Sequence, residues 1–178
     1  MTRIAYKPND IAAPKELVES IRARRGGRLL NLDRMLLHSP ALARGWNVYL
    51  RAVRTEFALP PKLRELAICA VAALNGADYE FVHHAPEFLQ AGGSDVQLAA
   101  LRRLPDTDVD TELFDATERA VIHLTVEMTR TVRVGDETFT LARAALASDQ
   151  TMVEMIGVIA AYNMVSRFLV ALEIETER

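Results

Sequence analysis

The sequence predicts an all-α protein, and three observations lead to that prediction. Apolar residues recur with helical spacing, as in Leu63, Leu66, Ala67, Ala70 and Val71. No comparable stretch alternates apolar and polar residues with the period of two that is typical of a strand. Prolines, glycines and Ser-Asp pairs stand between the apolar stretches, where helix ends favour them. We therefore expect helices and almost no β-structure.

The helices are expected, in chain order, over residues 14–25, 30–37, 40–56, 61–75, 77–91, 95–103, 115–130, 136–146 and 149–172. Prolines suit the first turn of a helix and occur at such starts at Pro14, Pro40, Pro60 and Pro61. Asn75-Gly76 and Gly92-Gly93 suit C-terminal caps. Ser94-Asp95 and Ser148-Asp149 suit N-terminal caps of the helices that follow them.

Part of this pattern occurs twice. RELAICAVAAL from Arg64 resembles ERAVIHLTVEM from Glu118, and AGGSDVQLAAL from Ala91 resembles ALASDQTMVEM from Ala145, at a period of about 54 residues. We expect two repeated helical hairpin units that bury their apolar faces against each other. Residues 104–113 lack apolar periodicity and are interpreted as the linker between the repeats. Residues 1–38 are interpreted as an N-terminal helical extension, and residues 39–178 as one compact body.

Composition and charge exclude several classes of function. The 178 residues carry a net charge of -3, which gives no field for nucleic acid, and Cys69 is the one cysteine, so no disulfide or dithiol can form within the chain. No uncharged apolar run approaches the roughly 20 residues of a membrane helix, and the first residues do not resemble a signal peptide. We expect a cytoplasmic protein. With 50% hydrophobic residues, surplus apolar surface favours a homo-oligomer.

Titratable residues gather around one predicted hairpin. Helical spacing places Glu80 and His84 on one face, with Tyr79 and His83 on an adjoining face, while Glu65 lies on the partner helix. A carboxylate that touches an imidazole raises its basicity, which favours proton transfer near neutral pH. The alternatives are structural: a surface Glu–His ion pair, a Glu65 that interacts with the helix dipole, and a Tyr79 that packs as a core aromatic.

The stretch LPPKLRELAICAVAALNGADYEFVHHAPEFLQAG, together with IAAYNMVSRFLVAL near the end, resembles the carboxymuconolactone decarboxylase / alkylhydroperoxidase D-like superfamily over about Ser39 to Leu172. The redox branch of that superfamily carries a glutamate, a Cys-x-x-Cys and a histidine. By the same spacing the glutamate is Glu65, the cysteine positions fall on Ala77 and Glu80, and the histidine is His84. Tyr79 occupies a polar position between the two missing cysteines.

The resemblance implies an alkylhydroperoxidase D-like helical fold and, because both sulfurs are missing, no dithiol peroxidase activity. The decarboxylase branch implies a lyase or isomerase that needs no cofactor or metal and acts on a small carboxylated lactone or related organic acid. In this hypothesis His84 exchanges a proton with carbon, Glu80 and Glu65 orient it, and Tyr79 or His83 donates to the developing enolate. A substrate carboxylate is expected to meet Arg167 and Asn163, although the same two residues suit a tie between helices.

Two other functions stay open at this stage. Glu65, Glu80 and His84, joined by His83, offer nitrogen and oxygen ligands for a metal-dependent enzyme. A non-catalytic oligomer that binds a small apolar molecule or a partner protein is also compatible with the composition. The resemblance implies dimers, trimers or hexamers.

Overall fold

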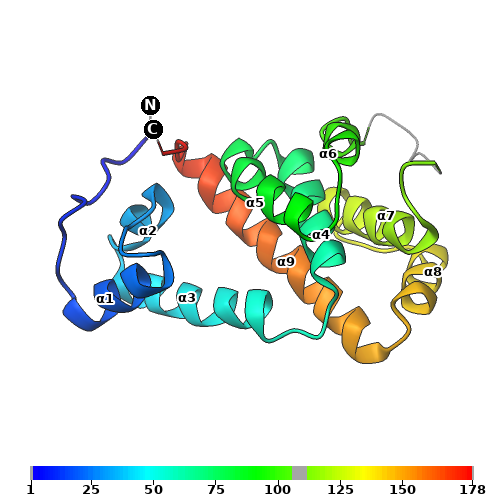
Figure 1. The fold of residues 1–178 in the computed structure, drawn as a ribbon, viewed down its shortest axis with the longest axis horizontal. Helices are drawn as coiled ribbons and strands as arrows, with labels where there is room; N and C mark the ends of the chain where they lie inside the picture. Colours follow the sequence, from blue (N-terminus) through cyan, green and yellow to red (C-terminus); the bar gives the residue numbers. More distant parts are fainter. Residues whose placement is uncertain (1, 106–111, 178) are drawn as a thin grey trace. The chain divides into compact units, whose positions relative to one another are not determined.

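The fold consists of helices. A computed structural model of the chain describes residues 2–105 and 112–177, and these residues contain no strand, which confirms the all-α prediction. The chain divides into two compact units (Figure 1): Met1–Glu56 with Leu169–Arg178, and Phe57–Phe168. Most of the predicted linker, residues 106–111, lies outside the described residues.

The first unit contains α1 (Lys15–Arg24), α2 (Asn31–Leu36) and α3 (Pro40–Thr55). Helix α3 packs against both others. The buried carboxylate of Asp33 binds the guanidinium groups of Arg24 at 3.6 Å and Arg25 at 3.3 Å. The two chain ends meet in this unit, because the hydroxyl of Thr2 donates to the carbonyl oxygen of Leu172 at 3.0 Å.

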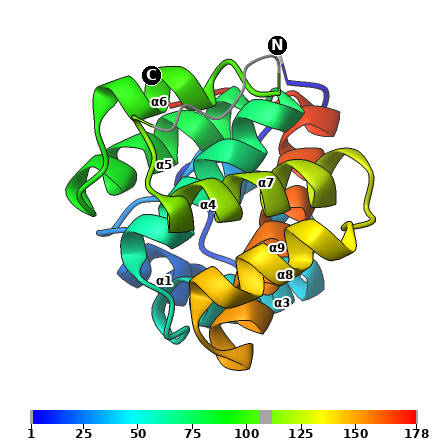
Figure 2. The ribbon, with the colours of Figure 1, turned by 90° about the vertical axis from the view of Figure 1, so that its right-hand side faces the viewer.

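The second unit contains α4 (Pro61–Asn75), α5 (Asp78–Gln90), α6 (Asp95–Leu101), α7 (Ala116–Arg130), α8 (Asp136–Leu146) and α9 (Asp149–Leu172) as far as Phe168. Helix α4 packs against α5 and α7, and α7 packs against α8 (Figure 2). These contacts agree with the predicted repeat, in which the first helices of the two hairpins pair with each other. Every residue from Leu66 to Ala72 is buried, so α4 is the centre of this unit.

The predicted helix caps are present. Gly76 ends α4 with a φ of 65°, a left-handed conformation that glycine adopts without strain. The hydroxyl of Ser94 accepts the backbone N–H of Gln97 at 3.2 Å, and that of Ser148 accepts the N–H of Thr151 at 3.1 Å. Because these caps set where each helix starts and ends, the observed boundaries fall close to the predicted ones.

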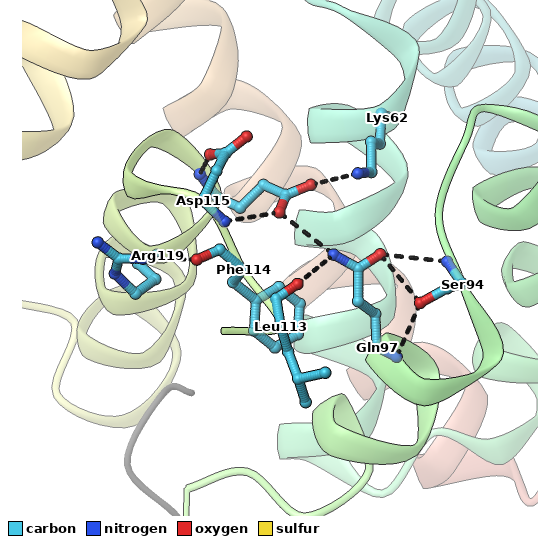
Figure 3. A network of polar contacts seen from close by, with 8 residues as sticks. Lys62, Ser94, Gln97, Leu113, Phe114, Asp115 and Arg119 are labelled. Atoms are coloured by element: carbon cyan, nitrogen blue, oxygen red, sulfur yellow. Dashed lines mark hydrogen bonds and ion pairs between the residues drawn. The ribbon is translucent and has the colours of Figure 1, made fainter. Parts of the chain in front are cut away.

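A polar network around the buried carboxylate of Glu118 ties α4 to α6 and α7 (Figure 3). Glu118, in the first turn of α7, binds Lys62 of α4 at 2.6 Å and accepts the side-chain N–H of Gln97 of α6 at 3.2 Å. The same carboxylate accepts the backbone N–H of Asp115, and Asp115 in turn caps the N–H of Glu118 at 2.8 Å. The network holds the start of α4 and thereby the position of Glu65.

Helix α9 is the most apolar helix. Among the described residues it alone is long and apolar enough to cross a membrane, with a mean hydropathy of 1.7, whereas the sequence analysis expected no such segment. Helix α9 meets the criteria of length and mean hydropathy because its charged residues are few and widely spaced. Ile159 and Tyr162 are fully buried in the second unit, as in the core helix of a soluble protein. A single helix of this kind is weak support for a membrane span.

Candidate active site

The turn between α4 and α5 brings Glu65 and His84 together. The N–H of Ala77 donates to the carbonyl oxygen of Ala72 at 2.8 Å around Gly76, and this cap reverses the chain within a few residues. Across the resulting hairpin, Nδ1 of His84 lies 2.7 Å from Oε2 of Glu65. Glu65 exposes 4% and His84 8% of its surface. The two groups therefore interact out of reach of bulk water.

The carboxylate of Glu65 stays ionised in this environment. Burial by itself raises the pKa of Glu65, but the hydrogen bond and charge of His84, with those of Arg64, lower the pKa below its ordinary value of 4.5. Nε of Arg64 donates to Oε1 of Glu65 at 3.1 Å. An ionised carboxylate only accepts hydrogen bonds, so Nδ1 of His84 carries the proton between the two groups. Nε2 of His84 is then the nitrogen with a lone pair in the neutral ring.

Glu80 contacts a residue that the sequence pattern did not indicate. It exposes 2% of its surface, and its Oε1 lies 2.9 Å from the hydroxyl of Ser166 on α9. The same hydroxyl lies 2.8 Å from the carbonyl oxygen of Tyr162, and with one hydrogen it donates to one of these oxygens at a time. Glu65 accepts the hydrogen bond of Nδ1 of His84, and Glu80 links α5 to α9 through Ser166.

Aromatic rings border the cluster on two sides. The ring of Tyr162 meets the ring of His84 edge-on, with centroids 5.0 Å apart. Tyr79 is buried and stacks on His83 at 4.3 Å, and Nδ1–H of His83 donates to the carbonyl oxygen of Tyr79 at 2.7 Å. Helix α5 therefore places His84 toward α9 and Glu65, while His83 stacks on its own helix.

Asn163 and Arg167 form a tie between helices. The side-chain amide of Asn75 at the end of α4 donates to Oδ1 of Asn163 at 3.1 Å, and the amide of Asn163 donates to Thr129 of α7 at 3.0 Å. Arg167 is exposed and donates to Oδ1 of Asn163 at 2.6 Å. These contacts match the structural alternative for the two residues, a tie between helices.

Cys69 lies in the interior beside the acids. Burial raises the pKa of the Cys69 thiol far above its usual range, and the negative charges of Glu65 and Glu80 raise it further. Both carboxylates therefore disfavour the charged form of one buried thiol. The thiolate that redox chemistry requires is strongly disfavoured.

No metal centre is evident in the described part of the chain: residues 2–105 and 112–177 contain no group of three or more His, Cys, Asp or Glu side chains placed to hold a metal ion. Glu65 and His84 are engaged with each other, and Glu80 with Ser166.

Sequence reasoning did not identify Ser166, Tyr162 and Arg64. Ser166 is separated from Glu80 by 86 positions, and no spacing rule spans that distance. The available signal was a single hydroxyl in the apolar run VSRFLVAL of the last helix. A buried polar residue there requires a partner, and Glu80 is that partner.

The sequence of this chain matches one known protein family. The sequence model of the carboxymuconolactone decarboxylase family matches residues 40–122, which include Glu65, Glu80 and His84. Over residues 40–122 the chain is similar to this family, and the similarity supports the resemblance to the carboxymuconolactone decarboxylase / alkylhydroperoxidase D-like superfamily. This chain lacks the Cys-x-x-Cys pair of that superfamily's redox branch, since Cys69 is its one cysteine.

Several solved structures have a fold similar to that of this chain. An uncharacterised peroxidase-related protein from Ralstonia eutropha, described as an alkylhydroperoxidase core, has a TM-score of 0.82 at 17% identity, covering 99% of this chain and 92% of that chain. A peroxidase-related protein from a Silicibacter species has a TM-score of 0.81 at 17% identity, with the same coverage. The debrominase Bmp8 in complex with 2,3,4-tribromopyrrole has a TM-score of 0.79 at 16% identity, covering 99% and 94%.

At these identities the likeness shows the fold alone. It confirms the predicted alkylhydroperoxidase D-like helical fold. A comparison with curated protein sequences gives no match.

Proposed function

We propose that the chain is a cofactor-free acid–base enzyme, a lyase or isomerase that acts on a small carboxylated lactone or a related organic acid. The observation that carries this proposal is the buried hydrogen bond of 2.7 Å between Glu65 and His84. A buried carboxylate that fixes one imidazole nitrogen leaves the other to exchange protons, and this is a recurrent arrangement for general acid–base catalysis.

In the proposed reaction His84 carries the proton. For isomerisation, Nε2 of His84 takes a proton from the carbon next to the lactone carbonyl, and the electron pair moves onto the carbonyl oxygen as an enolate. The proton then returns to another carbon of the same system. For decarboxylation, the bond to the carboxylate carbon breaks, carbon dioxide leaves, and protonated His84 delivers its proton to the carbon that lost it. Glu65 stabilises the protonated ring in both cases.

Other side chains have supporting roles in this proposal. Tyr79 or His83 donates to the enolate oxygen, and Glu80, which contacts Ser166, orients His84 together with Glu65. Arg167, with Asn163, binds the substrate carboxylate because guanidinium groups suit bidentate contact with carboxylates. Peroxide reduction through a dithiol is not part of the proposal, since the one cysteine is buried and held protonated.

The decisive experiment is a substrate screen with matched variants. Small carboxylated lactones, related organic acids and a brominated pyrrole are incubated with the wild-type protein, and product formation is followed by chromatography. The pyrrole is included because a structural relative is a debrominase. On the substrate that turns over, His84→Gln should lower kcat by about 100-fold or more. Glu65→Gln should lower kcat and shift the pH dependence of turnover, since Gln keeps the shape and removes the charge.

His123→Gln is the matched control, because His123 is an exposed histidine of α7 outside the cluster. Its turnover should equal that of the wild type, with the fold of every variant verified by circular dichroism. Equal turnover of His84→Gln and wild type would remove His84 from the mechanism. A compound that stabilises the protein against heat but is recovered unchanged would favour the non-catalytic binding alternative.

We also propose a homo-oligomer and a cytoplasmic location. The exposed apolar side chains Val132, Leu141 and Val153 in the second unit supply the surface that association would cover. Sedimentation equilibrium at several concentrations measures the assembly directly, and a monomer at all concentrations would contradict the first proposal. Cell fractionation tests the cytoplasmic location.

A further inference from the structure

The first unit contains a cavity that the acid–base site does not use. It has a volume of about 550 Å³ and is lined by residues from the N-terminal segment, α1, α2 and the C-terminal tail. Three of its lining residues are arginines: Arg22, Arg28 and Arg34. Two glutamates, Glu175 and Glu177, line the same cavity, so its formal charge is +1, and it rises to +2 when the Glu177 carboxylate is displaced, which favours an anion.

The charges of these arginines are not neutralised by ion pairs. Arg22 donates to backbone carbonyl oxygens, including that of Asn9 at 2.5 Å. Arg34 donates to the carbonyl oxygen of Lys7 at 2.5 Å and lies over the ring of Tyr6 at 4.9 Å. Within the described part of the chain Arg28 has no polar partner and is exposed. A carbonyl oxygen carries no net charge, so it orients a guanidinium group without neutralising its positive charge.

The C-terminal tail reaches the same cavity with two carboxylates, those of Glu175 and Glu177. Oε1 of Glu177 accepts the backbone N–H of Asn31 at 2.6 Å, and the side chain of Asn31 donates to the carbonyl oxygen of Glu175 at 2.9 Å. The hydroxyl of Tyr6 accepts the N–H of Glu175 at 2.9 Å. Glu177 is exposed, so its carboxylate faces solvent as well as the N–H of Asn31.

We propose that this cavity is a binding site for a small molecule that carries carboxylate or phosphate groups, and that the carboxylate of Glu177 is an internal competitor for it. The oxyanion binds the guanidinium of Arg28, whose planar fork suits two oxygens of one group, and the backbone N–H of Asn31 that Glu177 occupies. A molecule with two negative charges fits best, because displacement of Glu177 leaves three guanidinium groups and one carboxylate, that of Glu175, around the cavity. The site is independent of the proposed acid–base reaction.

The test is isothermal titration calorimetry of the full chain with malonate and, separately, inorganic phosphate at low ionic strength. We expect one of them to bind with a Kd of about 1 mM or tighter. The tighter of the two identifies the class of anion. Binding of neither anion, to the wild type or to Glu177→Ala, would overturn the proposal.

Two variants and two controls locate the site. Arg28→Ala should weaken binding about tenfold, the effect of losing one charge-assisted contact, and Glu177→Ala should tighten it about threefold or more. Arg103→Ala and Glu137→Ala change the charge equally at exposed positions of the second unit and should leave the Kd unchanged. If Arg28→Ala and Arg103→Ala changed the Kd equally, binding would depend on overall charge, and the proposed site would be wrong. An unchanged Kd in Glu177→Ala would overturn the competitor role.

Discussion

Nδ1 of His84 donates a hydrogen bond of 2.7 Å to Oε2 of Glu65 across two antiparallel helices, in a part of the unit from which bulk water is excluded. The two residues lie 19 positions apart, and the glycine cap between their helices sets that approach. Low dielectric surroundings strengthen such a bond and make its loss costly. Several consequences can be measured.

The stability that Glu65 contributes should depend on pH. Because interactions with His84 and Arg64 lower the pKa of Glu65 below 4.5, they stabilise the fold above about pH 4.5, and this contribution is lost as the pH falls through the lowered pKa. Glu65→Gln should therefore reduce the free energy of unfolding by about 2 to 4 kcal/mol at pH 7, and by less at pH 3. Urea denaturation across this pH range measures the difference. A difference that is constant with pH would contradict the prediction, and exposed Glu137→Gln serves as the control.

Cys69 should be inert in the folded protein. Its buried thiol has a raised pKa, so little thiolate exists at pH 8. We expect a thiol reagent to label the native protein negligibly within hours and to label one equivalent after unfolding in guanidinium. Cys69→Ala should retain the turnover of the wild type. Rapid labelling of the native protein would show that the thiol is accessible.

Ser166 should stabilise the fold through Glu80. Ser166→Ala removes the hydroxyl that lies 2.9 Å from the buried carboxylate of Glu80, and the cost should be about 1 to 3 kcal/mol in free energy of unfolding. Combination with Glu80→Gln in a double-mutant cycle should give a coupling energy of at least about 0.5 kcal/mol. Ser20→Ala, an exposed serine that bonds a backbone carbonyl, is the matched control. Additive effects would show that the contact contributes nothing to stability.

Asn163 and Arg167 should separate into a structural and a binding role. Asn163→Ala breaks the contacts to Asn75 and Thr129 and should cost about 1 to 3 kcal/mol of stability. Arg167→Ala removes an exposed side chain and should change stability by less than about 1 kcal/mol. On an identified substrate, Arg167→Ala should raise KM about tenfold with little change in kcat, because it loses one contact to the carboxylate. An unchanged KM would assign Arg167 to the tie alone.

Rules that depend on neighbouring residues were sufficient to predict most of the fold. The caps at Gly76, Ser94 and Ser148 were predicted correctly because each depends on one or two neighbouring residues. The pairing of α4 with α7 followed from the repeat, since two copies of one amphipathic hairpin bury the same faces. The sequence contains no uncharged apolar run of about 20 residues, and α9 meets the criteria of length and mean hydropathy although it carries charged residues, which is weak support for a membrane span.

For the candidate site, the sequence was sufficient where two groups are linked by one short turn. Glu65 and His84 were predicted as neighbours on that basis, and the hydrogen bond confirms their proximity. The partner of Glu80 was not predictable, because α5 and α9 are far apart in the sequence and no local pattern specifies which hydroxyl faces which carboxylate.

The amino-acid sequence by itself determined the helical class, the helix limits, the duplicated hairpin and the loss of the cysteine pair, since each depends on residue type and short-range spacing. Tertiary structure alone decided that Glu65 binds Nδ1 of His84 while Glu80 binds Ser166, and that the C-terminal Glu177 reaches Asn31. These choices depend on how helices distant in sequence pack, and packing is set by the whole core at once.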